Sequence, residues 1–428
     1  MSKRGGEEGE EQTKKKREDR TENSKQLPNY LSHEIIDQIL SRLPVKSLLR
    51  FRCVCKSWCS LISDSNFVKT HLSCMSRSEE DDYKHYKIIS HSPCDGYLLE
   101  SWSLYSVLYE KSFKPDLALH LKNMHREFSF VGSCNGLLCI KFLDEVFIWN
   151  PSIRKSKRLP DSGMSVGTYG FGYDESILDY KVVGVFWRTG FLVPQVMVYT
   201  LKSDTWRRIQ DFPCKQPPLG SGKFANKALH WPVWGPNYSW VIVSLDLAKE
   251  IYEEVAQPKY EDVAESEDGQ IVSLDLAKET YKEGAQPKYE DGEESEDGEE
   301  SEDEDFNLYL GILKGCLCVQ RNYHGTRARA DLWVMKEFGV RDSWTKLVSI
   351  PYTYFYFYLT DSEEVGYSLP LCISKNGEIL LVLDSLIIYD LKKNTLRFPS
   401  YSGSIFQLET YVESLVSPSA DNELQEYH

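Results

Sequence analysis

The sequence predicts an α+β multidomain chain in which a small three-helix module precedes a larger, mainly antiparallel β domain. Three observations predict it. Between residues 27 and 72 apolar residues recur at three- and four-residue steps, which is the period of a helix. From about residue 85 they form short alternating runs, separated by turn residues about every ten positions. A run of acids then interrupts the second pattern, with charges too dense to fold.

The first predicted helix has one apolar face. The residues of that face are Ile35, Ile36, Ile39, Leu40 and Leu43. Ser32 is placed to cap this helix, and Glu34 puts an acid in the first turn, where the helix dipole favours it. Because Pro44 cannot continue a helix, we expect the helix to end at Leu43.

Two further short helices are expected before residue 72. The second carries Leu48, Leu49 and Phe51, and the third carries Val54, Trp58, Leu61 and Ile62. So short a segment buries little core, so its apolar surface is expected to pack on a second body. The periodicity alone fits equally well an ordinary helical cap on the next domain.

The identities of the residues in segment 27–72 are more specific than the helical spacing of its apolar residues. Residues 27–72 contain the runs Leu27-Pro28, Leu43-Pro44 and Val54-Cys55-Lys56-Ser57-Trp58. With these runs the segment closely resembles an F-box, the helical module by which substrate receptors dock on a cullin-based ubiquitin ligase. The resemblance implies contacts with a Skp-type adaptor, and through it a cullin-RING ligase, from Leu27, Pro28, Ile39, Leu40, Leu43, Pro44, Leu48 and Val54. It places Trp58 in the core of the module.

The β domain repeats a strand that ends in a polar turn and is followed by another short strand. The last residues of these strands are Asn150, Thr200, Asp246, Met335 and Asp390, at intervals of 50, 46, 89 and 55. A period near fifty, with several strands per unit, predicts a kelch-like β-propeller. Tight hairpins are expected at Asn135-Gly136, Lys314-Gly315 and Asn376-Gly377, since glycine adopts positive φ without strain.

The long interval of 89 has a cause in the sequence. Residues 242–269 are nearly repeated at 271–298, an offset of 29. We expect the first copy to form the blade strand because it continues directly from Trp240. Residues 257–305 then form a duplicated acidic insert loop, and deletion of residues 271–305 is expected to leave the fold intact.

Five short motifs occur in residues 85–418: Trp149-Asn150-Pro151-Ser152, Tyr169 to Asp174, Asp179 to Val183, Ala228 to Trp231 and Tyr411 to Val416. With these motifs the region resembles the plant F-box-associated domain. Together with the F-box, the resemblance covers about residues 27–418, and the chain is similar to the family that includes the S-locus F-box and general F-box/kelch-repeat proteins. Residues 1–26 and 419–428 are expected to be tails, the first of them charged and disordered.

The charge of the chain is concentrated in one place. The net charge is −15, but residues 253–305 hold 22 acids and 4 Lys, so the rest of the chain carries about +3. This balance gives no case for a nucleic-acid partner. No segment is apolar for long enough to span a membrane, so no membrane association is expected. Eleven cysteines without paired spacing fit a reduced intracellular protein.

Two polar segments have alternative interpretations. The cluster Lys14-Lys15-Lys16-Arg17 favours a solvated tail, with nuclear import as the alternative, so a cytoplasmic location is expected and a nuclear one is the alternative. In the insert, Ser301 is a candidate phosphorylation site because Glu304 follows three residues later. A solvated loop remains the simpler interpretation of the insert.

A search for catalytic or metal-binding groups finds little. His230 beside Trp231 fits a packed core histidine better than a base. Cys316 and Cys318 share one strand face, and no second pair completes a zinc site, so neither a metal nor a cofactor is expected. The chain contains no phosphate-cradling glycine loop and no nucleophile elbow.

The resemblance therefore implies a non-catalytic receptor subunit of an SCF-type (Skp-cullin-F-box) ubiquitin ligase. Its F-box holds the adaptor, and its β domain holds a target that is then ubiquitinated and degraded. Two alternatives stay open: an interaction protein that assembles no ligase, and a propeller enzyme resembling kelch-type oxidases. The target is equally open, between a secreted ribonuclease for a pollen-type receptor and a protein of defence or development.

Overall fold

The structure is a computed structural model of the 428-residue chain. It describes residues 32–76, 83–92, 98–120, 128–164, 167–188, 192–235, 239–260, 270–273, 282–285, 306–323, 329–351, 369–382, 386–399 and 407–419. The chain divides into two compact units, Met1–Leu43 and Pro44–His428. The first unit contributes one described helix, α2 (His33–Leu40).

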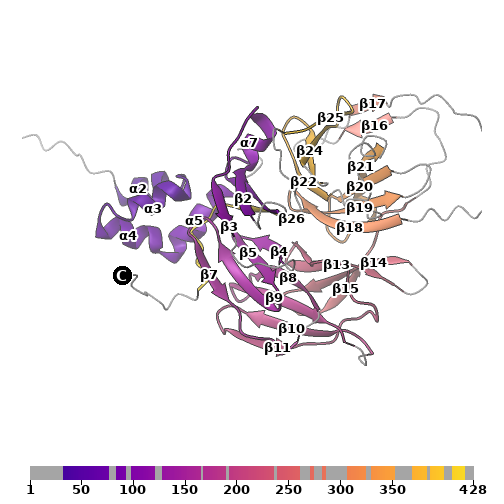
Figure 1. Cartoon of the computed structure of the whole chain (residues 1–428), viewed down its shortest axis with the longest axis horizontal. Coiled ribbons are helices and arrows are strands. Elements are labelled where there is room, and N and C mark those ends of the chain that lie inside the picture. The colour runs from indigo at the N-terminus through magenta and orange to yellow at the C-terminus, as the bar shows by residue number, and fades with distance from the viewer. Residues whose placement is uncertain are drawn as a thin grey trace, which may run out of the picture. The chain divides into compact units, whose positions relative to one another are not determined.

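The second unit begins with helices and continues as six four-stranded sheets within the described residues (Figure 1). Its helices are α3 (Val45–Phe51), α4 (Lys56–Ser63), α5 (Ser65–Met75), α7 (Leu104–Tyr109) and the short 3-10 helix η2 (Arg341–Ser343). Each sheet is an antiparallel meander, and together the sheets form the blades of a six-bladed β-propeller.

The first three blades span residues 86–208, apart from one strand. Blade 1 contains β1 (Tyr86–Ser92), β2 (Leu98–Ser103), β3 (Leu117–His120) and β26 (Gln407–Val412). Blade 2 contains β4 (Phe128–Cys134), β5 (Leu137–Phe142), β6 (Glu145–Asn150) and β7 (Lys155–Arg158). Blade 3 contains β8 (Gly167–Asp174), β9 (Asp179–Phe186), β10 (Gln195–Thr200) and β11 (Thr205–Arg208).

The other three blades follow in chain order. Blade 4 contains β12 (Lys223–Ala225), β13 (Ala228–Trp234), β14 (Trp240–Asp246) and β15 (Tyr252–Val255). Blade 5 contains β18 (Phe306–Leu313), β19 (Cys316–Tyr323), β20 (Arg329–Met335) and β21 (Trp344–Pro351). Blade 6 contains β22 (Leu369–Ile373), β23 (Glu378–Val382), β24 (Leu386–Asp390) and β25 (Thr395–Arg397).

Blade 1 is assembled from both ends of the propeller sequence. Its strand order is β26-β1-β2-β3, so the last strand of the chain pairs antiparallel with the first. The register places Tyr86 opposite Val412 and His91 opposite Gln407. This pairing closes the ring and removes a sheet edge that would otherwise be open to other chains.

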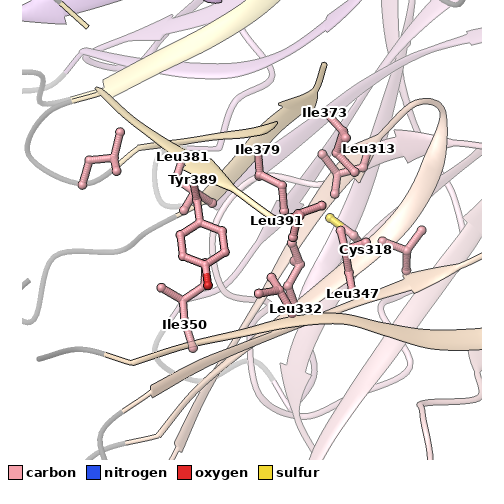
Figure 2. Packing of buried hydrophobic residues seen from close by; sticks show 14 residues of the cluster. Leu313, Cys318, Leu332, Leu347, Ile350, Ile373, Ile379, Leu381, Tyr389 and Leu391 are labelled. Atoms are coloured by element: carbon pink, nitrogen blue, oxygen red, sulfur yellow. The ribbon is translucent and has the colours of Figure 1, made fainter. Parts of the chain in front are cut away.

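Each pair of consecutive blades shares a hydrophobic cluster. Six such clusters are found among the described residues, and the one between blades 6 and 1 closes the circuit. Figure 2 shows the cluster between blades 5 and 6, where Leu313, Leu332 and Leu347 pack with Ile379 and Leu391. The core is therefore a ring of blade-to-blade interfaces rather than one central mass.

The predicted repeat is confirmed strand by strand. Asn150, Thr200, Asp246, Met335 and Asp390 are the last residues of the third strands of blades 2 to 6. The sequence left the number of blades open. Blade 1 lacked this motif, and its innermost strand lies more than three hundred residues away at the C-terminal end.

Two of the predicted tight hairpins have positive φ at both central residues. Asn135 and Gly136 have φ of 53° and 80°, and Lys314 and Gly315 have φ of 49° and 77°. Such turns match the twist of the strands that they join. At Asn376-Gly377 only the glycine has a positive φ, 81°.

The first copy of the duplicated segment forms the blade, as expected. It supplies β14 and β15, whereas the second copy forms a separate hairpin of β16 (Gln270–Ser273) and β17 (Lys282–Ala285), where only a loop was expected. The two hairpins share one register, because Ile242 lies opposite Val255 and Ile271 lies opposite Gly284, each 29 residues later. The rest of residues 261–305 lies outside the described residues.

One substitution between the copies favours the first copy. Val255 is only 6% exposed in blade 4, and the position 29 residues later holds Gly284. Placing the second copy in the blade would therefore replace a buried valine side chain by a hydrogen atom. A loss of this kind costs about 2–4 kcal/mol, so the first copy is preferred.

Two deletions of equal length test this preference. Removing residues 271–299 keeps the first copy, and we expect the melting temperature to stay within about 2 °C of the parent. Removing residues 242–270 keeps Trp240 but forces Gly284 into the place of Val255, so the free energy of unfolding should fall by about 2–4 kcal/mol. Denaturant unfolding of both variants measures the difference, and equal stability would contradict the assignment.

Candidate functional site

Helix α2 begins as the sequence predicted. The backbone N–H of Ile35 donates to the Ser32 side-chain oxygen at 3.4 Å, so Ser32 is the N-cap, and Glu34 lies in the first turn. Ile35 and Ile39 are 44% and 48% exposed. Two exposed isoleucines one helical turn apart form an apolar strip that is available to a partner.

The end of α2 differs from the prediction. The helix stops at Leu40 rather than at Leu43, and residues 41–43 form a turn in which the N–H of Leu43 donates to the Leu40 carbonyl at 3.0 Å. Pro44 is the N-cap of α3, where its missing N–H costs nothing. The proline therefore starts the second helix as well as excluding a longer first one.

A fourth helix was missed between residues 65 and 75. The third predicted helix is α4, and Asp64 then caps α5 through bonds from the N–H groups of Asn66 and Phe67 at 2.9 and 3.1 Å. An acid immediately before a helical run is a recognised start signal, and it was present in the sequence. Phe67 and His71 are buried one turn apart and stack with ring centroids 6.3 Å apart.

The predicted adaptor contacts divide by exposure. Ile39, Pro44 and Val54 are exposed, Val54 to 62%, and Leu43 is half-buried. Leu40 and Leu48 are buried, at 2% and 0%. Leu27 and Pro28 lie outside the described residues. The exposed side chains are the ones a partner can reach directly, and the assignment of all eight stays a prediction.

Trp58, predicted as core of the module, is half-buried. Its ring meets Phe51 edge to face, with centroids 5.5 Å apart. The contact joins α4 to α3 and fixes the turn between them. That turn, residues 52–55, is exposed throughout and contains Val54.

Asn150, the last residue of β6, links blade 2 to the C-terminal segment of the propeller by hydrogen bonds. Its side chain is fully buried, and its amide donates to the carbonyl oxygens of Ser414 and Val416 at 3.1 and 2.8 Å. The side-chain oxygen Oδ1 of Asn150 accepts from the backbone N–H of Ser152 at 2.9 Å. A side-chain amide both donates and accepts, whereas an ionised carboxylate only accepts, so Asn150 ties the C-terminal segment to blade 2 in a way that aspartate cannot.

Comparison with known proteins gives two domain matches. Residues 29–70 match the F-box domain, and residues 98–272 match the F-box associated beta propeller domain. An F-box/kelch-repeat protein of Arabidopsis thaliana is 31% identical over 410 residues, covering 92% of this chain and 97% of the relative. This chain belongs to the plant F-box protein family.

Other relatives span the same length. The Arabidopsis thaliana F-box protein CPR1 is 29% identical over 421 residues, covering 90% of this chain and 88% of the relative. Among solved structures, TolB from Acinetobacter baumannii has a TM-score of 0.41 at 9% identity, covering 82% of this chain and 73% of that chain.

Two sequence signatures of the F-box-associated domain meet in a buried ion network. Lys181 lies 2.8 Å from Asp174 and 2.9 Å from Glu250, and Glu250 also pairs with Arg207. Burial raises the pKa of Asp174, but hydrogen bonds from Lys181 and Ser176 outweigh it, so the pKa lies below its ordinary value of 3.8. The network ties blade 3 to blade 4, and breaking such a pair costs about 3–5 kcal/mol.

His230 is a packed core residue, as the sequence indicated. It is fully buried, its Nε2 lies 3.1 Å from the Ala225 carbonyl oxygen, and its ring lies 5.3 Å from that of Phe338. Burial lowers its pKa to about 4. The side chain is therefore neutral across the physiological range and holds the β12–β13 turn.

The remaining candidates add no site. Cys316 is half-buried and Cys318 is buried on the same face of β19. Within the described ranges, no three side chains of His, Cys, Asp or Glu gather closely enough to hold a metal ion. In the same residues no helix has the length and apolar character to cross a membrane. Ser301 lies outside the described part of the chain.

The hydrogen bonds of Asn150 predict a loss of stability on substitution. Replacing Asn150 by Asp keeps the side-chain oxygen that accepts from Ser152 but leaves the carbonyls of Ser414 and Val416 without this donor, so the free energy of unfolding should fall by about 2–4 kcal/mol. Asp246→Asn is the matched control, because Asp246 ends the third strand of blade 4 and only accepts, from the N–H groups of Ala248 and Lys249. If denaturant unfolding shows the same loss of unfolding free energy for both variants, the proposed role of the Asn150 amide is contradicted.

His230 predicts a pH dependence of stability. Its pKa is about 4 in the folded chain against an ordinary 6.5, so protonation favours the unfolded state. The contribution of neutral His230 to the free energy of unfolding is complete above pH 6.5. It falls by about 2–3 kcal/mol as the pH is lowered toward 4. His230→Gln should flatten the stability profile in that window, whereas the exposed His33→Gln should not; identical profiles would refute the assignment.

Proposed function

We propose that this chain is the substrate-recognition subunit of an SCF-type ubiquitin ligase. The observation that carries the proposal is the F-box match at residues 29–70, together with the exposed apolar side chains of Ile39, Pro44 and Val54 on that module. Proteins with an F-box and a propeller are typically receptors without catalysis of their own. The F-box is proposed to hold a Skp-type adaptor, and the adaptor a cullin-RING ligase.

The propeller is proposed to hold the target protein. Six blades closed by β26 make a rigid support, and the connections between strands supply variable surfaces on it. The ligase then works by proximity, because holding two reactants together lowers a barrier by roughly 7–11 kcal/mol in the best-oriented cases and a scaffold reaches part of that. The chain is proposed to act in the cytoplasm, with the nucleus as the alternative compartment, on a target that is then degraded.

The central test changes Leu43 and Pro44 together to alanine. Removing the half-buried leucine and the exposed proline should weaken capture of a recombinant Skp-type adaptor by about a hundredfold or more, because central apolar anchors dominate such interfaces. The propeller should stay folded, and titration calorimetry with circular dichroism measures both properties.

A control pair and a surface variant sharpen the test. Leu219 and Ile251 are exposed to 53% and 54% on the propeller, so changing both to alanine should leave adaptor affinity unchanged. Val54→Asp alters a residue that is 62% exposed and so should weaken binding without unfolding the module. Undiminished adaptor binding by both F-box variants would sink the assignment of these contacts.

A further inference from the structure

Arg321 of β19 lies among three aromatic rings. The centre of its guanidinium group is 3.5 Å from the ring centroid of Phe306, 4.5 Å from that of Tyr260 and 4.8 Å from that of Tyr323. Its Nε atom is buried and has no hydrogen-bond partner in the structure as described. Cation–π contact with three rings compensates for the lost hydration of the guanidinium group. Among the described residues, no carboxylate forms an ion pair with it.

Two of these rings flank the acidic segment, residues 261–305. Tyr260 is the residue before the segment, and Phe306 is the residue after it. The indole N–H of Trp344 donates to the Ala256 carbonyl at 2.7 Å, and that of Trp240 donates to the Phe306 carbonyl at 3.3 Å. The segment therefore leaves and re-enters the propeller at one place, and Arg321 lies at that place.

Two further cations lie over neighbouring rings of blade 5. Arg329 lies 3.9 Å from the Tyr323 ring, Lys346 lies 5.8 Å from the Trp333 ring, and both side chains are 31% exposed. Asp331 is a shared partner, 2.7 Å from Lys346 and 3.6 Å from Arg329. Arg321, Arg329 and Lys346 thus stand beside one carboxylate, that of Asp331, which lies opposite Arg321 in the β19–β20 register, so this part of blade 5 carries an excess of positive charge.

The acidic segment has the complementary charge. Residues 261–305 hold 20 acids and 3 lysines, a net charge of −17. Six of the acids lie within four residues of Tyr260 or Phe306: Glu261, Asp262, Glu302, Asp303, Glu304 and Asp305. Four residues span at most about 14 Å, so these carboxylates must stay near Arg321. Such distances are little more than the Debye length of about 8–10 Å, so attraction persists in physiological salt.

We propose that the surface formed by Arg321, Arg329, Lys346 and the rings of Tyr260, Phe306 and Tyr323 is a docking site for acidic polypeptide. Its resident occupant is segment 261–305 of the same chain. A tethered segment acts at an effective concentration of about a millimolar, so it holds this site against a free acidic peptide. The proposal concerns blade 5 alone and stands whether or not the chain assembles a ligase.

The test uses a fluorescent peptide of residues 290–305 and two forms of the chain. One form is the full chain, and the other joins Tyr260 to Phe306 by a Gly-Ser-Gly-Ser linker. Fluorescence anisotropy in about 50 mM salt should show the shortened chain binding the peptide at least about tenfold more tightly than the full chain, because the tethered competitor is gone. A full-length variant with all 20 acids of the segment changed to Gln or Asn should behave like the shortened chain and replaces it if that chain does not fold.

Paired substitutions locate the site. Arg329→Gln with Lys346→Gln in the shortened or neutralised chain should weaken peptide binding by about tenfold or more, as expected for two lost charge contacts. Lys155→Gln with Arg158→Gln on the outer strand β7 removes the same charge elsewhere and should have little effect. Equal binding by full and shortened chains, binding by neither, or equal effects of the two pairs would each overturn the proposal.

Discussion

Closure of the propeller ring is the constraint on which the rest of the structure depends. The innermost strand of blade 1 is β26, from the C-terminal end, so the ring stays open until residues 407–412 pair with β1. The six blade-to-blade clusters then have no free ends. The Asn150 amide secures the segment that follows β26, which explains why Trp149-Asn150-Pro151-Ser152 and the closing Tyr411 to Val416 act as signatures although they lie far apart in sequence.

Much of the fold can be predicted from the sequence, because the motif that marks each blade lies within a few consecutive residues. Third-strand ends such as Asn150 and Asp390 carry a turn motif within a few residues, and Asn135-Gly136 specifies its own hairpin. Blade 1 could not be predicted, because its strands β1 and β26 lie over three hundred residues apart and no repeat in the sequence indicates that they pair. The end of α2 was misplaced because Pro44 was taken only as a stop, although proline is equally suited to begin a helix.

The candidate site was predicted to a similar degree. The adaptor residues came from a motif, which marks positions but not exposure, so it grouped the exposed Val54 with the buried Leu48. Lys181 and Asp174 lay inside two signatures, but Glu250 belongs to the next blade and only the fold brings it to Lys181. The same holds for Arg321, whose rings come from either side of the acidic segment. The closed ring of blades thus gives a rigid support, and the two residues that flank segment 261–305 meet beside Arg321 on blade 5.

The central claim is that the F-box module recruits a Skp-type adaptor. The most direct measurement is capture of recombinant adaptor by the full chain and by a version lacking residues 27–72, with circular dichroism confirming that both are folded. The account predicts capture by the full chain and none by the shortened one. Failure of the folded full chain to bind any Skp-type adaptor, or equal capture without residues 27–72, would contradict it and leave a propeller that binds its partners without a ligase.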